Sequence, residues 1–171
     1  TFRKGVSQIK PDSNPDIVSD FYAVMGDILH EKGLDKEAFE SYDSCLQWKP
    51  DNFAALNNYA YYLSEKRKDL SKAEQMSYKT IKAEPNNATY LDTYAWILFQ
   101  QERYQEAKIY IDQTIKNDKA PSGVVIEHAG DIYFNAGEPE KALEYWKQAS
   151  ENGNNSAILK RKIEQKKYIV K

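Results

Sequence analysis

The chain has 171 residues, of which 41% are hydrophobic and 29% charged, and its net charge is −2. These proportions are those of a folded chain, and the nearly balanced charge excludes a general polyanion-binding protein. The single cysteine, Cys45, excludes an internal disulfide framework and a metal site made of several cysteines.

The chain starts with TFRKGVSQIKP, which has the pattern of the second half of an amphipathic helix. We therefore expect residues 1–11 to be the remainder of a second helix from a preceding repeat, followed by a linker over residues 12–18. Because the chain begins with Thr1 and not with methionine, we expect it to be a C-terminal piece of a longer protein.

Markers then recur with a constant period. Small residues fall at Gly26, Ala60, Ala95 and Gly130, with spacings of 34, 35 and 35. A second series falls at Ala38, Ala73, Ala107 and Ala142, with spacings of 35, 34 and 35. Prolines close the first three units at Pro50, Pro85 and Pro121. A fixed period of this length indicates a solenoid of repeated units. The units span residues 19–52, 53–87, 88–122 and 123–156.

Each unit is predicted to form two helices. In the first unit Tyr22, Met25 and Leu29 share one apolar face at helical spacing, and the other units repeat this pattern. The small residue on that helix allows its partner to approach closely, since a bulky side chain there would separate the backbones. Gly33 and Gly137 suit the left-handed turn that ends a helix.

The stretch YAVMGDILHEKGLDKEAFESYDSCLQWKP resembles a tetratricopeptide repeat, and the next three units resemble the same family. The resemblance implies an all-α fold, a right-handed superhelix (α-solenoid) of about four helix-turn-helix units. Lys68 and Glu102 depart from the family pattern, because they stand where a turn glycine is usual. Residues 157–171 are expected to form a basic capping helix that covers the last repeat, with Ile158, Leu159 and Ile163 facing inward.

The resemblance also implies a concave groove, lined by the first helix of each unit. Seven of the twenty positions expected on this groove are acidic and none is lysine or arginine. The candidate binding residues are Asp27, Tyr61, Asp92, Trp96, Phe99, Glu127, Asp131 and Phe134. Such a groove favours a peptide or partner segment with basic or apolar side chains. Two alternatives stay open. Acidic residues in the first turns of a helix can instead stabilise its dipole, and the aromatic rings can pack against neighbouring helices.

Two further kinds of partner are less favoured. Family members that hold a carboxylate tail use lysine, arginine and asparagine in the groove, and only Asn58 matches that set.

Residues 157–171 carry a net charge of +5, which leaves −7 on the remainder. This segment is either a solvated face or a contact for an anionic surface. It lacks interleaved aromatic residues, so no nucleic acid partner is expected.

No catalytic, cofactor-binding or metal-binding motif is present in the sequence. The two histidines, His30 and His128, lie in non-adjacent units, and no glycine-rich phosphate loop or nucleophile elbow occurs. We therefore expect no enzyme activity, no cofactor and no metal.

The sequence predicts a non-catalytic protein–protein interaction scaffold from a larger tetratricopeptide repeat protein. One alternative is a structural module that self-assembles through exposed repeat ends. Another is a regulatory domain joined to an upstream enzyme or glycan-handling system. The stretches LNNYAYYLSEK and YLDTYAWILF are similar to repeats of bacterial, envelope-associated members of the family. This favours the periplasm or the outer membrane over the cytoplasm.

Overall fold

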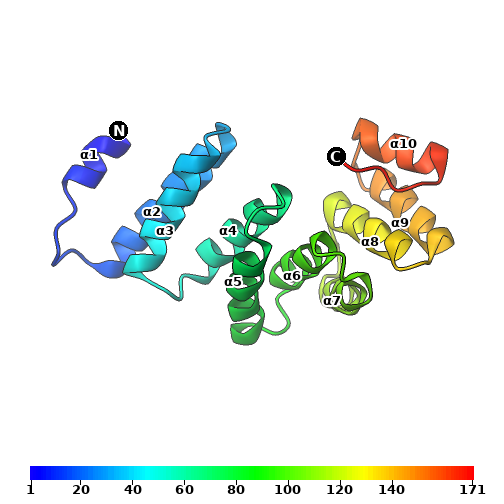
Figure 1. Cartoon of the computed structure of the whole chain (residues 1–171), viewed down its shortest axis with the longest axis horizontal. Helices are drawn as coiled ribbons and strands as arrows, with labels where there is room; N and C mark the ends of the chain where they lie inside the picture. Colours follow the sequence, from blue (N-terminus) through cyan, green and yellow to red (C-terminus); the bar gives the residue numbers. More distant parts are fainter.

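The computed structural model describes residues 1–171 and contains ten α-helices and no strand. The helices are α1 (Phe2–Ser7), α2 (Pro15–Glu31), α3 (Asp35–Trp48), α4 (Phe53–Glu65), α5 (Leu70–Ala83), α6 (Ala88–Gln100), α7 (Tyr104–Asn117), α8 (Gly123–Asn135), α9 (Pro139–Glu151) and α10 (Ala157–Gln165). Four antiparallel pairs, α2/α3 to α8/α9, follow one another in chain order, and the array bends so that both ends rise on one side (Figure 1). The predicted all-α solenoid is confirmed.

Side-chain caps start the first helix of every pair. Asn14, Asn52, Asn87 and Ser122 each accept a hydrogen bond from a backbone N–H of the first turn, and Ser156 does the same for α10. Such a cap satisfies one of the N–H groups that a helix start leaves without an internal partner. The second helices begin without a side-chain cap, immediately after the tight turn.

Left-handed residues form the turns within the pairs. Gly33 and Gly137 have φ values of +74° and +91°, as predicted from the sequence. Glu102 takes the same conformation, with φ of +63°, although it is not glycine. In the second unit the positive φ values fall at Arg67 and Asp69, on either side of Lys68.

The small residues of the first helices lie against aromatic rings of the second helices. A Cβ at Gly26 would lie 2.9 Å from the ring of Tyr42, and a Cβ at Gly130 would overlap the indole of Trp146. Both rings are fully buried. Helix α6 joins the two halves of the core, because Leu98 packs into the C-terminal cluster and Ile97 into the N-terminal cluster. The core is therefore continuous along the array.

The two ends differ from the predictions. The N-terminal helix α1 covers only Phe2–Ser7 and has no buried residue. Helix α2 begins at Pro15, inside the expected linker, because Asn14 accepts hydrogen bonds from the N–H groups of Asp16 and Ile17. Helix α10 stops at Gln165, since Lys166 is left-handed (φ +50°), so residues 166–171 are not helical.

The prediction of which residues of α10 face inward is confirmed in part. Leu159 is fully buried, whereas Ile158 and Ile163 are partly buried. No helix of the chain combines the length and the apolar character that a membrane span requires.

The contact of Gly130 generates the first testable prediction. Gly130→Ala should lower the free energy of unfolding by about 1–3 kcal/mol, because the added methyl group overpacks the ring of Trp146. The measurement is urea unfolding followed by circular dichroism. Gln148→Ala, on an exposed position of α9, is the matched control and should change stability little. Equal stability of the two variants would contradict this account of the helix pair.

Candidate partner-binding groove

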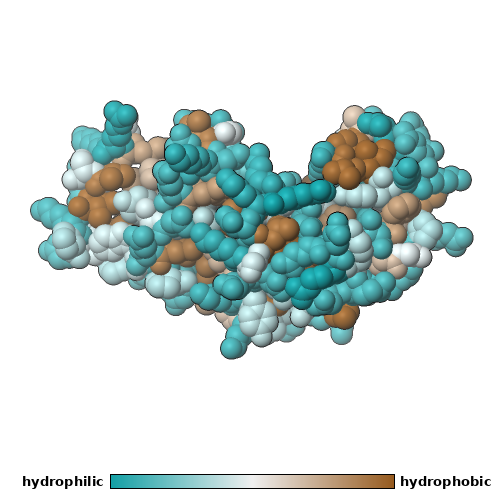
Figure 2. All heavy atoms as spheres, in the orientation of Figure 1, coloured by the Kyte–Doolittle hydropathy of each residue, from teal (hydrophilic) through white to brown (hydrophobic).

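The concave side of the array is formed by the first helices, α2, α4, α6 and α8. Positions on these helices are numbered here from their small residues, Gly26, Ala60, Ala95 and Gly130. At position +1 stand Asp27, Tyr61, Trp96 and Asp131, all of which were predicted to belong to the groove. The space-filling view shows that the molecule is hollowed over its middle repeats (Figure 2).

Trp96 forms a buried aromatic cluster in the middle of this side. Its ring stacks on Phe99 at 4.7 Å and on the imidazole of His128 at 4.0 Å between centroids. Its Nε1 donates a hydrogen bond of 2.8 Å to Glu65. Only 5% of Trp96 and 4% of Phe99 are exposed. These two predicted groove residues therefore lie beneath the surface. Phe134, which is partly buried, stacks on Trp146 at 5.6 Å.

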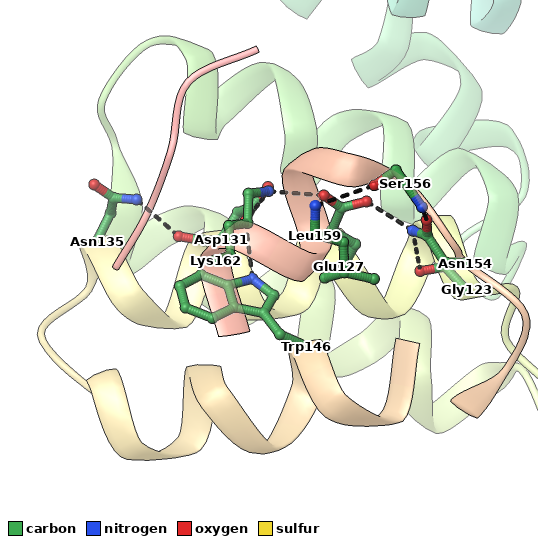
Figure 3. A network of polar contacts seen from close by, with 9 residues as sticks. All are labelled: Gly123, Glu127, Asp131, Asn135, Trp146, Asn154, Ser156, Leu159 and Lys162. Carbon is green, nitrogen blue, oxygen red and sulfur yellow. Dashed lines mark hydrogen bonds and ion pairs between the residues drawn. The ribbon is translucent and has the colours of Figure 1, made fainter. Parts of the chain in front are cut away.

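Glu127 and Asp131 bind a lysine of the same chain. Lys162 of α10 is fully buried, and its Nζ lies 2.8 Å from Glu127 Oε1 and 2.7 Å from Asp131 Oδ1 (Figure 3). Trp146 Nε1 donates to Asp131 at 3.0 Å, and Asn154 Nδ2 donates to Glu127 at 2.7 Å. These two carboxylates were expected to face a partner. The structure places them instead in an internal ion-pair network.

Burial and charge act differently on the two carboxyl groups. Burial raises the pKa of Asp131 to about 6, although Lys162 opposes this effect. Burial also acts to raise the pKa of Glu127, but Lys162 and Asn154 outweigh it and the net pKa is lowered. The two groups therefore share one cation unequally.

A second buried ion pair joins α6 and α8. His128 Nδ1 lies 3.0 Å from Asp92 Oδ1, and both residues are less than a tenth exposed. Burial alone would lower the pKa of His128, but the Asp92 carboxylate more than offsets this and raises it. The imidazolium form is stabilised at this position.

Asp27, in the first unit, has only neutral partners. The hydroxyl of Tyr42 and the Nδ2 of Asn58 both donate to its Oδ1, the latter at 3.2 Å. No lysine or arginine pairs with Asp27. The charge of this carboxylate is thus not neutralised within the chain, unlike the charge of Asp131.

An open cavity of about 360 Å³, named here the central hollow, lies between α4, α6 and the start of α8. Its lining consists of Asn57, Asn58, Tyr61, Tyr62, Thr89, Asp92, Thr93, Ser122, Val124, Val125 and His128. No lysine or arginine lines it. Tyr61 and Asp92 are the two predicted groove residues that the structure brings together here.

The segment after α10 lies over the other half of the concave side. The ring of Tyr168 meets Phe99 edge-on at 5.6 Å, and Lys162 Nζ lies 5.5 Å from its centroid. Burial raises the pKa of Tyr168 to about 12. Tyr168 and its neighbours leave a space of only about 50 Å³ beside Trp96 and Glu65. The concave side is therefore open at α4 and α6 and filled near α10.

Lys162 is the residue that reasoning from the sequence missed, since it was counted with the exposed cations of the capping segment. A signal for its role was present. Lys162 follows the cap Ser156 by six residues, as Asn58 follows Asn52 and His128 follows Ser122. It therefore occupies the helix position that faces the preceding repeat. No group of three or more His, Cys, Asp or Glu residues is arranged to hold a metal ion.

The family model described as "Tetratricopeptide repeat" matches residues 19–52. A TPR repeat-containing protein of Pseudomonas aeruginosa is 29% identical over 83 residues, which are 48% of this chain. The chain spans 14% of the length of that relative.

Several solved structures share the fold. PilF of Pseudomonas aeruginosa has a TM-score of 0.72 at 19% identity, covering 96% of this chain and 72% of that one. A thermophilic TPR protein of Thermus thermophilus has a TM-score of 0.72 at 12% identity, covering 96% and 86%. MamA of Desulfovibrio magneticus has a TM-score of 0.67 at 16% identity, covering 81% and 78%. At these identities the likeness concerns the fold alone.

The buried lysine gives a stability prediction. Lys162→Met should lower the free energy of unfolding by about 3 kcal/mol or more, because two buried carboxylates lose their cation. Lys160→Met removes an exposed lysine from the same helix and should change stability by about 0.5 kcal/mol or less. Urea unfolding of both variants measures the difference. Similar values would show that the network does not hold α10 in place.

The raised pKa of His128 predicts a pH dependence. Its stabilising contribution is complete below the ordinary histidine value of 6.5 and disappears as the pH rises through the higher folded-state pKa. The free energy of unfolding should therefore decrease above pH 6.5. The raised pKa of Asp131 changes the free energy of unfolding only between about pH 4 and 6, which lies below this pH range.

Asp92→Asn and His128→Gln should each remove the decrease above pH 6.5, since either change eliminates the charge pair. Chemical unfolding at half-unit intervals from pH 6 to 9 provides the measurement. An undiminished slope in both variants would assign the dependence to other groups.

Proposed function

Because this chain is built of tetratricopeptide repeats, we propose that it is a non-catalytic scaffold that binds a segment of a partner protein in its concave groove. The observation that carries this proposal is the central hollow, which is open to solvent between three successive repeats. Val124, on its edge, is 47% exposed and offers an apolar contact beside polar groups. Concave sites that combine apolar surface with a few polar groups are typical binding sites.

Charge supports a basic or apolar partner segment. Asp20, Asp27, Glu31 and Glu65 lie on the groove side of α2 and α4, and none of them pairs with a lysine or arginine. Uncompensated carboxylates attract a cationic segment during its approach and disfavour an acidic one. The acids near α10 contribute less, since Lys162 neutralises them within the chain.

The buried positions restrict where the partner segment binds. Trp96 and Phe99 support the groove from beneath, and Tyr168 covers Phe99. The contact surface that we propose is therefore Tyr61, Tyr62 and Val124 around the central hollow, together with the carboxylates of α2. Asp92 also lines this hollow, and the remaining predicted groove residues hold the surface in position.

Self-assembly is a second candidate function, favoured by the apolar N-terminal end. Ile17 is 68% exposed, and a cavity of about 460 Å³ separates α1 from α2 beside Val18 and Phe21. Concentration-dependent dimers in sedimentation, lost in Ile17→Lys, would support this function. A monomer at all concentrations would exclude it for the isolated chain.

We also propose a location in the bacterial cell envelope, on the resemblance of the α4 and α6 sequences to envelope-associated repeats. The full-length protein, fractionated from its own cells, tests this location. Recovery in the cytoplasmic fraction alone would contradict it.

The groove proposal predicts a site-specific crosslink. A photoreactive benzoylphenylalanine at Val124, in the central hollow, should form a discrete adduct with a partner protein in the native cell. The same residue at Ile109, which is 57% exposed on α7, is the matched control and should not form that adduct. Mass spectrometry of the adduct identifies the partner. An adduct from position 109 and none from position 124 would refute the concave site.

A further inference from the structure

Successive first helices of this chain meet through one recurring contact. A side chain at position −2 of one helix reaches position −3 or +1 of the preceding first helix. Asn58 donates to Asp27 at +1, and His128 pairs with Asp92 at −3 and stacks on Trp96 at +1. Lys162, at the matching place in α10, binds Glu127 at −3 and Asp131 at +1.

The junction between α4 and α6 lacks this contact. Position −2 of α6 is Thr93, whose short side chain makes no hydrogen bond in the structure. Positions −3 and +1 of α4 are Asn57 and Tyr61. Asn57 is 6% exposed, and its buried Oδ1 has no hydrogen-bond partner. An unsatisfied buried carbonyl of this kind destabilises the fold, and buried polar groups are nearly always hydrogen-bonded.

The orientation of Asn57 is set by a chain of hydrogen bonds. The Asp27 carboxylate only accepts, so Asn58 must turn its Nδ2 towards it. This leaves Asn58 Oδ1 to accept from Asn57 Nδ2, at 3.4 Å. The Oδ1 of Asn57 is consequently the atom left over. This atom is itself buried, while Asn57 as a residue lines the central hollow, so a donor in the hollow reaches Oδ1 when the Asn57 side chain turns towards it. The free group at this site is an acceptor, and it requires a donor.

We propose that the central hollow binds a lysine or arginine side chain of the partner segment, which supplies the donor that is missing at the α4/α6 junction. The inference rests on the proposed function and specifies the partner's chemistry. The Asp92 carboxylate, which already pairs with His128, also lines the hollow, as do Tyr61 and Tyr62, whose ring centroids are 6.1 Å apart. Carboxylate, carbonyl and aromatic faces together favour a cation over a neutral donor.

The chain itself binds one lysine side chain, Lys162, with groups of the same kinds. Lys162 is held by two carboxylates, and its Nζ lies 5.9 Å from the centroid of Trp146 and 5.5 Å from that of Tyr168. Glu127 and Asp131 occupy the positions that Asn57 and Tyr61 occupy on α4. The central hollow therefore shares its helix positions with the Lys162 site, but its carboxylate, Asp92, comes from α6 and already pairs with His128, and the hollow leaves space for a side chain to enter from outside.

The binding test uses two acetylated and amidated seven-residue probes, GSAKASG and the same peptide with norleucine in place of lysine. Norleucine keeps the length of the side chain and removes its charge. Nuclear magnetic resonance titration of the 171-residue chain should show binding of the lysine probe about tenfold tighter, as expected for a hydrogen bond to a charged group. The shifts should centre on Asn57, Tyr61 and Asp92.

Two variants test the site from within. Thr93→Lys places a cation where Lys162 stands in the last junction, and should abolish binding of the lysine probe. Asn57→Leu removes the free acceptor and should weaken the lysine probe about tenfold without weakening the norleucine probe. Gln113→Lys adds the same charge at an exposed position of α7 and is the matched control, expected to bind as the unmodified chain does.

Each outcome decides the proposal. Preference for lysine that disappears in both variants and persists in the control supports it. Equal binding of the two probes would overturn the cation site and leave the groove function standing. Lysine preference unchanged in both variants would place the cation elsewhere on the acidic face. If neither probe binds while the photoreactive residue at position 124 still crosslinks a partner, the hollow does not bind a basic side chain.

Discussion

The whole arrangement depends on the close approach of the two helices within each pair. Gly26 and Gly130 allow the rings of Tyr42 and Trp146 to lie directly on the backbone of the first helix. A pair formed in this way is still apolar on the sides that face its neighbours, so each pair is stable only beside the next one. The stacking of pairs then brings the first helices side by side at a constant offset. This offset determines which side chains meet on the concave side.

The constant offset has different chemical consequences at different junctions. Where α10 meets α8, a buried lysine satisfies two carboxylates, and removing it would leave both charges in an apolar surrounding. Where α8 meets α6, a histidine performs this role and makes the contact sensitive to pH. Where α6 meets α4, threonine is too short, and an acceptor remains without a partner. The groove is thus closed by internal contacts at one end and open in the middle.

These differences bear on the function proposed for the concave side. The polar contacts near α10 fix the last repeat and the segment that follows it, so this end has a structural role. The open junction lies between repeats that are held firmly on both sides by continuous core packing through Ile97 and Leu98. The binding site proposed at this junction is therefore preorganised, which lowers the entropic cost of ordering side chains on binding.

The repeat period, the helix pairs and the left-handed turns at Gly33 and Gly137 follow from local properties of the sequence, because spacing, small residues and glycine act over a few residues. The sequence also placed Tyr61, Asp92 and Trp96 on the concave side. How far each of them is exposed could not be predicted, since the exposure of a groove residue depends on which parts of the next repeats and of residues 166–171 cover it. The role of Lys162 and the free acceptor of Asn57 were likewise decided by tertiary structure. Both depend on whether a side chain from the following helix is long enough to reach, and no local pattern measures that distance.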